Sequence, residues 1–273
     1  MSRPGRGENV SVRLRPAVRG MYVFAALVVG GTAACGGPAP TEPAPSASGP
    51  AAPDPGDPRV QLAARAALAQ DHRFAALYRY DVPGQPTRNV VATVANDGSW
   101  RVDVAGGVLG GTTDVAIVSL DTGVFQCSLP SATNPISSTC IRVAAPGKRV
   151  PKEYDPRIER VFRQWLNVFT DRQSALSVSA ARPLAGSQGT CFSIDSISAS
   201  LNAAVDVGIY CYADNGLLTA ARVDAGTVTI AGTPVTPPAK VQLPGPIVDG
   251  GPMGLESPTP PPPAVSTAPS PSG

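Results

Sequence analysis

The cysteines are the residues of this 273-residue chain whose type and spacing most clearly predict covalent chemistry. Four of them, Cys127, Cys140, Cys191 and Cys211, form an even set in the body of the chain, and such a set in an exported protein predicts two disulfide bonds. Of the three possible connectivities we favour Cys127–Cys140 and Cys191–Cys211, because each pair lies on two short predicted strands that would face each other across a hairpin. A metal site is the alternative, but the spacings are not of the CxxC type and no histidine lies nearby in the sequence.

The fifth cysteine, Cys35, follows a segment with the features of a secretory signal peptide over residues 1–34. A basic region is followed by the short apolar run Met21–Val29, which is short for a bilayer span. Thr32-Ala33-Ala34-Cys35 resembles the bacterial lipobox, in which the cysteine is diacylated and becomes the first mature residue. Thr32 stands where leucine is usual, so plain secretion after general cleavage is an alternative, and an uncleaved anchor is another.

We predict that acyl chains on Cys35, including palmitate, hold the protein at the outer face of the cytoplasmic membrane. The diacylglyceryl group supplies two chains, the number at which membrane attachment becomes stable. The net charge of the chain is +2, but the leader carries five arginines and one glutamate, which leaves the mature part at −2. A weakly acidic protein has no basic patch to follow a phosphate backbone, so no nucleic-acid partner is predicted.

Few other residues could do chemistry. His72, the single histidine, lies at a predicted helix C-terminus, where the dipole favours a cation, so we predict a surface cap and not a catalytic base. Gly106–Gly111 lacks the lysine and the following helix of a phosphate loop, which predicts a flexible turn or, alternatively, a mobile lid at a pocket. Asp114 and Asp121 could form the carboxylate pair of a hydrolase only if the fold brings them together. We predict no enzyme, no catalytic residue, no metal and no cofactor.

Composition divides the rest of the chain. Residues 35–56 and 246–273 are rich in proline and serine without apolar periodicity, which predicts a flexible linker after Cys35 and a disordered tail, with a wall-threading or partner-binding tract as the alternative for the tail. Residues 57–245 are long enough to form one domain with a core.

Two helices are predicted within that domain. Asp57-Pro58 and Asp155-Pro156 each place aspartate at an N-cap and proline at the first helical position. The first helix covers about Val60–His72. The second has one continuous apolar stripe at helical spacing, formed by Ile158, Val161, Phe162, Trp165, Leu166 and Phe169. Such a stripe packs on a sheet, or alternatively lines a lipid cavity.

Eleven strands are predicted around these helices. They are divided by turn signals such as Asn96-Asp97-Gly98 and Asp214-Asn215-Gly216, and they cover residues 74–82, 89–95, 99–105, 114–120, 123–128, 139–144, 176–181, 190–197, 207–213, 217–223 and 227–231. Consecutive strands with tight turns pair antiparallel. The predicted fold is therefore α+β, a single curved antiparallel sheet (a half-barrel) with two main helices packed on one face.

The segments Cys191-Phe-Ser-Ile and Ile209-Tyr-Cys-Tyr-Ala-Asp-Asn-Gly-Leu-Leu-Thr219, with the helix-first order and the leader, resemble LolA-like envelope lipoproteins of actinobacteria. The resemblance covers about residues 58–235 and transfers no catalytic or binding residue. It implies a half-barrel whose helices close a cavity for acyl chains. The predicted function is a membrane-anchored carrier or binder of a lipid or other hydrophobic molecule. The alternatives are an interaction module of the envelope with no ligand cavity and, in third place, a secreted hydrolase.

Overall fold

The structure, a computed structural model, describes residues 54–197 and 205–257; Cys35, the leader and most of the linker lie outside these ranges. Helix α1 (Pro58–Asp71) begins where the sequence predicts. The Asp57 side chain accepts a hydrogen bond from the Arg59 amide at 2.8 Å, and Pro58 takes the first helical position. This confirms the predicted cap. Within the described ranges, no helix combines the length and the apolar character needed to cross a bilayer.

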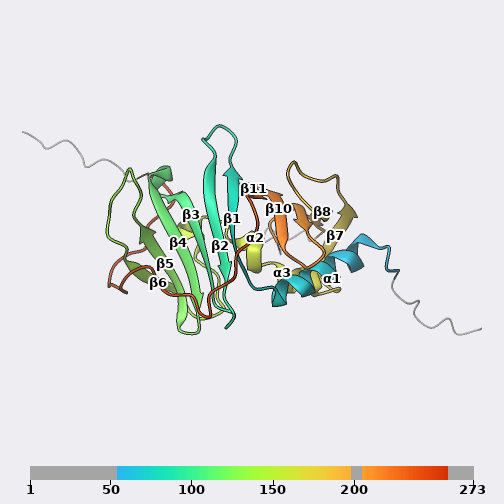
Figure 1. The fold of residues 1–273 in the computed structure, drawn as a ribbon, viewed down its shortest axis with the longest axis horizontal. Coiled ribbons are helices and arrows are strands. Elements are labelled where there is room, and N and C mark those ends of the chain that lie inside the picture. Colours follow the sequence, from blue (N-terminus) through green and yellow to red (C-terminus); the bar gives the residue numbers. More distant parts are fainter. Residues whose placement is uncertain (1–53, 198–204, 258–273) are drawn as a thin grey trace, which may run out of the picture. The chain divides into compact units, whose positions relative to one another are not determined.

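All eleven predicted strands are present, and they form one open antiparallel sheet in the order β6-β5-β4-β3-β2-β1-β11-β10-β9-β8-β7 (Figure 1). The strands are β1 (Phe74–Asp81), β2 (Arg88–Val94), β3 (Trp100–Val108), β4 (Thr113–Leu120), β5 (Gly123–Leu129), β6 (Cys140–Ala144), β7 (Leu176–Ala180), β8 (Thr190–Ser196), β9 (Gly208–Tyr212), β10 (Leu218–Val223) and β11 (Gly226–Ile230). The predicted fold class is confirmed: the sheet is curved and carries its helices on one face.

The chain forms this sheet as two meanders. Strands β1 to β6 run outward to one edge, and β7 to β11 return from the other edge until β11 pairs with β1, with Tyr78 opposite Ile230. Residues 145–175 connect the two edges and carry the remaining helices. We call residues 145–175 the crossover, and its helices, together with α1, cover one face of the sheet.

The prediction of one continuous second helix is wrong. The crossover contains two short helices, α2 (Arg160–Arg163) and α3 (Leu166–Thr170). Arg157 has a φ of 67°, in the left-handed region, while its amide donates to Asp155 Oδ1 at 2.7 Å. Asp155 thus caps a turn and not a long helix, and regular helix starts only at Arg160.

The main core lies between the helices and one face of the sheet. It joins Leu62, Ala66 and Ala69 of α1 to the apolar stripe of the crossover and to inward side chains of β1–β5 and β7–β11. A smaller core on the opposite face contains Phe125, Cys127, Cys140 and Val241. Both faces of β4–β6 are therefore covered.

Residues 235–257, here called the strap, provide part of that cover. Val235 pairs with Ala75 of β1, and Val241 is buried in the smaller core. Ile247 then pairs with Cys140 at the β6 edge, and Leu255 packs against the main core on the other face. The predicted boundary at residue 245 is therefore wrong. Residues 246–257 belong to the domain, because backbone hydrogen bonds attach them to β6 and to the segment after β3. Their sequence has no apolar periodicity that would predict this.

Candidate functional site

The apolar stripe of the crossover packs directly on aromatic side chains of the sheet. Phe162 contacts Tyr78 edge to face with ring centroids 4.9 Å apart, and Phe169 contacts Tyr210 in the same manner at 5.1 Å. The Tyr78 hydroxyl donates to Leu218 O at 2.8 Å, and the Tyr210 hydroxyl donates to Asp206 O at 2.7 Å. Burial raises the pKa of both phenols, so they stay neutral. The stripe forms part of the core, and the hydroxyl groups of the two tyrosines that it contacts are hydrogen-bonded inside that core.

A pair of buried carboxyl groups lies at the start of α2. Asp155 and Glu159 are 1% and 3% exposed, and Arg160 Nε donates to Asp155 Oδ2 at 2.8 Å. Burial, and next the Asp155 carboxylate, raise the pKa of Glu159 well above its ordinary range. Glu159 Oε2 has no hydrogen-bond partner among the described residues. The Arg160 guanidinium thus pairs with Asp155 and also reaches Asp206 Oδ1 at 3.5 Å, while burial favours the protonated form of Glu159.

This pair is not predicted from the sequence, which indicates only a helix cap at Asp155 and no role for Glu159. The i, i+4 spacing of the two acids beside an arginine was the available signal, but it is common on exposed helices.

The C-terminal end of α1 binds two guanidinium groups. Arg163 Nη1 donates to Gln70 O at 2.9 Å, and Arg73 Nη1 donates to the same oxygen at 2.8 Å. His72 is the C-cap, but burial and the adjacent Arg73 lower its pKa. The predicted position of His72 as the cap of this helix is confirmed, and the two arginine side chains supply the cationic groups at the helix end.

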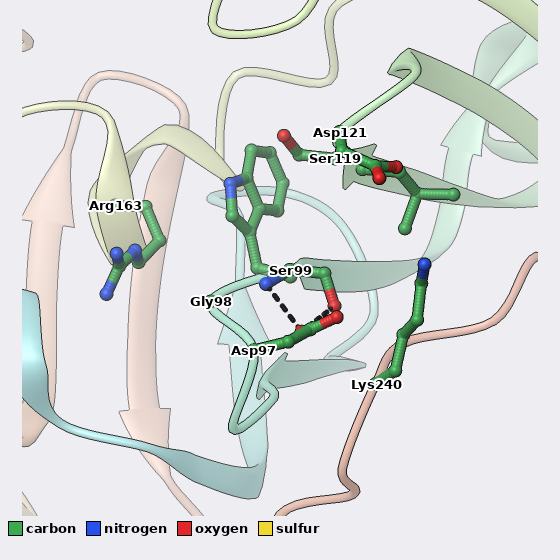
Figure 2. Close-up of a pocket in the computed structure, with 9 residues that line it drawn as sticks. Asp97, Gly98, Ser99, Ser119, Asp121, Arg163 and Lys240 are labelled. Atoms are coloured by element: carbon green, nitrogen blue, oxygen red, sulfur yellow. Dashed lines mark hydrogen bonds between the residues drawn. The ribbon is translucent and has the colours of Figure 1, made fainter.

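A pocket of about 500 Å³ opens at one end of the sheet (Figure 2). Its walls come from the β2–β3 turn, the β4–β5 turn, the strap and α2, and they are formed by Asp97, Gly98, Ser99, Trp100, Ser119, Leu120, Asp121, Arg163 and Lys240. Trp100 is partly exposed and also packs against the main core. The pocket therefore lies at the margin of the layer between helices and sheet.

The two aspartates that the sequence offered as a possible hydrolase pair lie apart. Asp114 belongs to the start of β4, and its Oδ1 accepts from Gly106 N at 2.7 Å, whereas Asp121 follows the end of the same strand and lines the pocket. A strand of this length separates them by roughly 20 Å. The structure does not bring them together.

The glycine loop Gly106–Gly111 is fixed at the strap. Leu109 N donates to Gly254 O at 2.9 Å, and Gly110 N donates to Leu255 O at 2.7 Å. A side chain at Gly110, where φ is 67°, would collide with Ser257. The alternative of a mobile lid at a pocket mouth is not what the structure shows, since backbone hydrogen bonds hold the loop.

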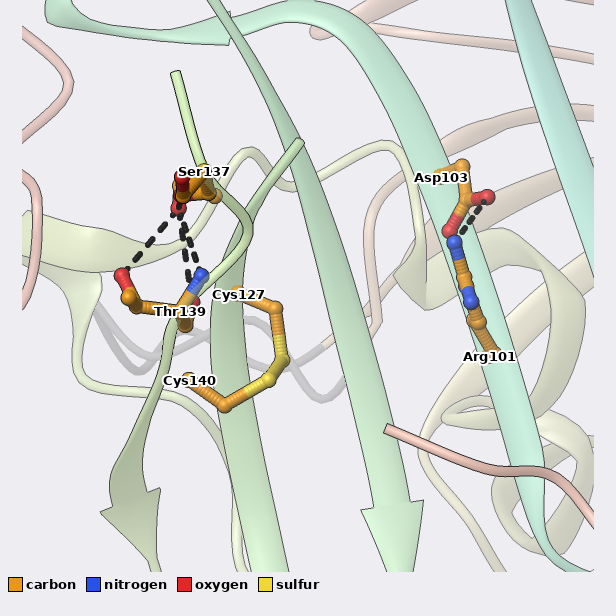
Figure 3. Close-up of a disulfide and its surroundings, with 7 residues drawn as sticks. Arg101, Asp103, Cys127, Ser137, Thr139 and Cys140 are labelled. Carbon is orange, nitrogen blue, oxygen red and sulfur yellow. Dashed lines mark hydrogen bonds and ion pairs between the residues drawn. A yellow bond between two sulfur atoms is a disulfide. The ribbon is translucent and has the colours of Figure 1, made fainter. Parts of the chain in front are cut away.

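Both disulfides are present with the favoured connectivity. Cys127–Cys140 joins neighbouring residues of β5 and β6 (Figure 3), and Cys191–Cys211 joins β8 and β9. All four sulfur atoms are oxidised, so they cannot act as thiolate metal ligands. Next to the first bridge, Thr139 N donates to the buried Ser128 Oγ at 3.0 Å. Each bridge therefore staples a strand pair inside a core.

Removal of either bridge is expected to lower the free energy of unfolding by about 3 kcal/mol, because loops of this size gain that much conformational entropy in the unfolded chain. The Cys127→Ala/Cys140→Ala and Cys191→Ala/Cys211→Ala variants test this in equilibrium denaturant unfolding. Treating each variant with reductant should destabilise it further by the remaining bridge alone. Unchanged midpoints in both variants would contradict the expectation.

Comparison with known proteins identifies no family. No family model and no curated protein matches the sequence. Among solved structures, the chain is similar to one described as the crystal structure of MucB, with 15% identity and a TM-score of 0.39. The match covers 72% of this chain and 65% of that one, which is less than two thirds of the MucB chain. A likeness of this degree carries no functional information, and the resemblance to LolA-like lipoproteins stays a prediction.

Proposed function

We propose that this protein is an extracytoplasmic binder of a hydrophobic or amphiphilic molecule, held at the membrane by acyl chains on Cys35. The observation that supports the proposal is the aromatic layer between α2–α3 and the sheet, with the pocket of Figure 2 at its margin. Acyl chains bind where apolar walls exclude water, and this layer has such walls on both sides. The two disulfides fit a protein that folds outside the cytoplasm.

Binding would require the crossover to move from the sheet. Helices α2 and α3 have four and five residues, and helices so short are not stable without tertiary contacts. Polar contacts attach the crossover at several points, among them Arg163 to Gln70 O and Gln70 Nε2 to Asn167 Oδ1 at 2.8 Å. For an acyl chain to enter, these contacts with α1 would break, and the chain would replace the aromatic contacts that the crossover loses with the sheet.

A test of the proposal is lipid extraction and native mass spectrometry of protein purified from a lipid-containing host, with a fluorescent fatty acid as probe. We expect co-purified acyl species and saturable probe binding that quenches Trp165, which is 2% exposed in the layer. Leu68→Ala, at an exposed position of α1, is the control and should bind equally. For the anchor, a labelled fatty acid should be incorporated into wild type and not into Cys35→Ala.

An interaction module without a ligand is the second candidate. The observation that favours it is that Trp165, Phe169 and Tyr210 are already buried, so the protein's own side chains fill the layer. Protein that carries no acyl species and does not bind the probe would overturn the binder proposal in favour of this one.

A further inference from the structure

We propose that the pocket lined by Trp100, Asp97, Asp121 and Lys240 binds a neutral, hydroxyl-rich ring, the pyranose group of a sugar. If the proposed function holds, this group is the head of an amphiphile whose chain enters the layer between helices and sheet. The pocket proposal rests on the proposed function only for that chain, since a free glycoside can occupy the pocket by itself.

The polar groups of the pocket come from opposite sides. In Figure 2, Asp121 and Ser119 lie on one side, Asp97 and Ser99 lie on the other, and Lys240 extends between them. Asp97 Oδ1 already accepts from Ser99 N at 2.9 Å and from Ser99 Oγ at 2.5 Å, so Ser99 and this oxygen shape the wall. The second Asp97 oxygen, the Asp121 carboxylate, the Ser119 hydroxyl and the Lys240 ammonium supply the acceptors and donors that a hydroxyl-bearing ligand needs. A volume of about 500 Å³ is within the usual range for small-molecule sites.

The charges of the pocket disfavour an anion and present groups of both signs to a ligand. The Arg163 guanidinium is directed in Figure 2 away from the other labelled side chains and donates to Gln70 O at 2.9 Å. Lys240 therefore remains as the cation available beside Asp97 and Asp121. An anion would approach two carboxylates, whereas a cation would be attracted by the carboxylates but would leave the Lys240 ammonium without an acceptor. A neutral polyol donates to the carboxylates and accepts from the ammonium, so it satisfies all three.

Trp100 supplies the apolar surface that a pyranose also needs. One part of the side chain packs against the main core, while the side chain as a whole remains partly exposed in the pocket. The C–H face of a sugar ring is apolar and can lie on an indole ring, as other apolar groups do. Because Trp100 contacts both the pocket and the main core, an amphiphile with its head group in the pocket would have its chain next to that core.

The chain has two tryptophans, so the indole N–H signals in an NMR spectrum separate the two sites. Trp165 is the internal control, because its Nε1 donates to Asp206 Oδ2 at 3.2 Å inside the core. The probes are a panel of methyl pyranosides (gluco, galacto, manno and N-acetylglucosaminide), with choline chloride and sodium octanoate as ionic and acyl controls. We expect at least one glycoside to move the Trp100 signal saturably and to leave the Trp165 signal in place.

Asp121→Asn and Lys240→Gln should each weaken this binding about 10-fold, while Asp249→Asn and Lys148→Gln, at exposed positions outside the pocket, should not change it. If no glycoside moves the Trp100 signal, or if choline moves it equally, the pocket proposal is overturned. Octanoate that perturbs Trp165 while the glycosides have no effect would leave the proposed function standing and remove the pocket. Glycoside binding without any acyl binding would leave the pocket proposal standing and overturn the proposed binding of an acyl chain.

Discussion

A chain that ends at residue 245 is expected to melt about 10 °C below the full-length protein, whereas a chain that ends at residue 257 should keep its melting temperature. The shorter chain loses residues 246–257, the part of the strap that passes the β6 edge and reaches the helical face. The expected loss is about 3–5 kcal/mol, which corresponds to about 10 °C in a domain of this size.

The partners of Gln126 account for a large part of this loss, and the backbone hydrogen bonds that residues 246–257 make with Cys140, Leu109 and Gly110 add to it. This side chain is 2% exposed, and its Nε2 donates to Met253 O at 2.9 Å while its Oε1 accepts from Met253 N at 2.7 Å. Without Met253 a buried amide loses two of its hydrogen bonds, which costs about 1–3 kcal/mol. Met253 and Leu255 also cover part of the main core, and exposing the surface beneath them adds about 1–2 kcal/mol.

The measurement is thermal unfolding of the three chains at equal concentration. Removal of residues 258–273 leaves every one of these contacts in place, so the longer truncation product is the matched control. Gln126→Leu should recover part of the loss in the short chain, because an apolar side chain has no polar group to leave unpaired. Equal melting temperatures for the two truncated chains would show that residues 246–257 of the strap do not stabilise the domain.

The strands of this protein could be predicted from the sequence because their signals are local. Trp100–Val104 alternates between apolar and polar residues, and Asn96-Asp97-Gly98 marks the turn before it. The cysteine pairing followed from the same strands, since register places Cys127 opposite Cys140. Neighbouring strands with short turns pair antiparallel, so the sheet followed as well.

The crossover and the strap could not be predicted, because tertiary contacts determine both. The apolar stripe of the crossover has the spacing of one helix. Asp155 and Glu159 are buried, however, and Arg157 has a left-handed backbone conformation, so regular helix begins only at Arg160. The strap has no periodicity, and mainly its backbone groups bind the sheet. The pocket could not be predicted from the sequence for a related reason. Its charged residues Asp97, Asp121 and Lys240 come from three distant segments, and their proximity depends on the register of two turns and on the course of the strap.

The carboxyl pair at the start of α2 gives the second large expected effect. Arg160→Met should lower the free energy of unfolding by about 3–5 kcal/mol, because it leaves the buried Asp155 carboxylate without its cation. Glu159→Gln should instead stabilise the protein at neutral pH. Glu159 interacts with the Asp155 side chain, and a glutamine amide there can donate to the Asp155 carboxylate and has no proton to lose.

The sign of the pH dependence follows from the raised pKa of Glu159. Below about pH 4, the ordinary range of a glutamate in an unfolded chain, the carboxyl is protonated in both states and the residue contributes no pH dependence. As the pH rises above that value, the unfolded chain releases the proton while the folded protein keeps it, so stability falls until the folded pKa is reached. The advantage of Glu159→Gln over wild type should therefore be smallest near pH 4 and larger at pH 7. Denaturant unfolding at both pH values measures this, with Glu153→Gln, at an exposed position of the same crossover, as the control. An advantage that does not change between the two pH values would mean that Glu159 is ionised in the folded protein and that α2 does not depend on a protonated carboxyl.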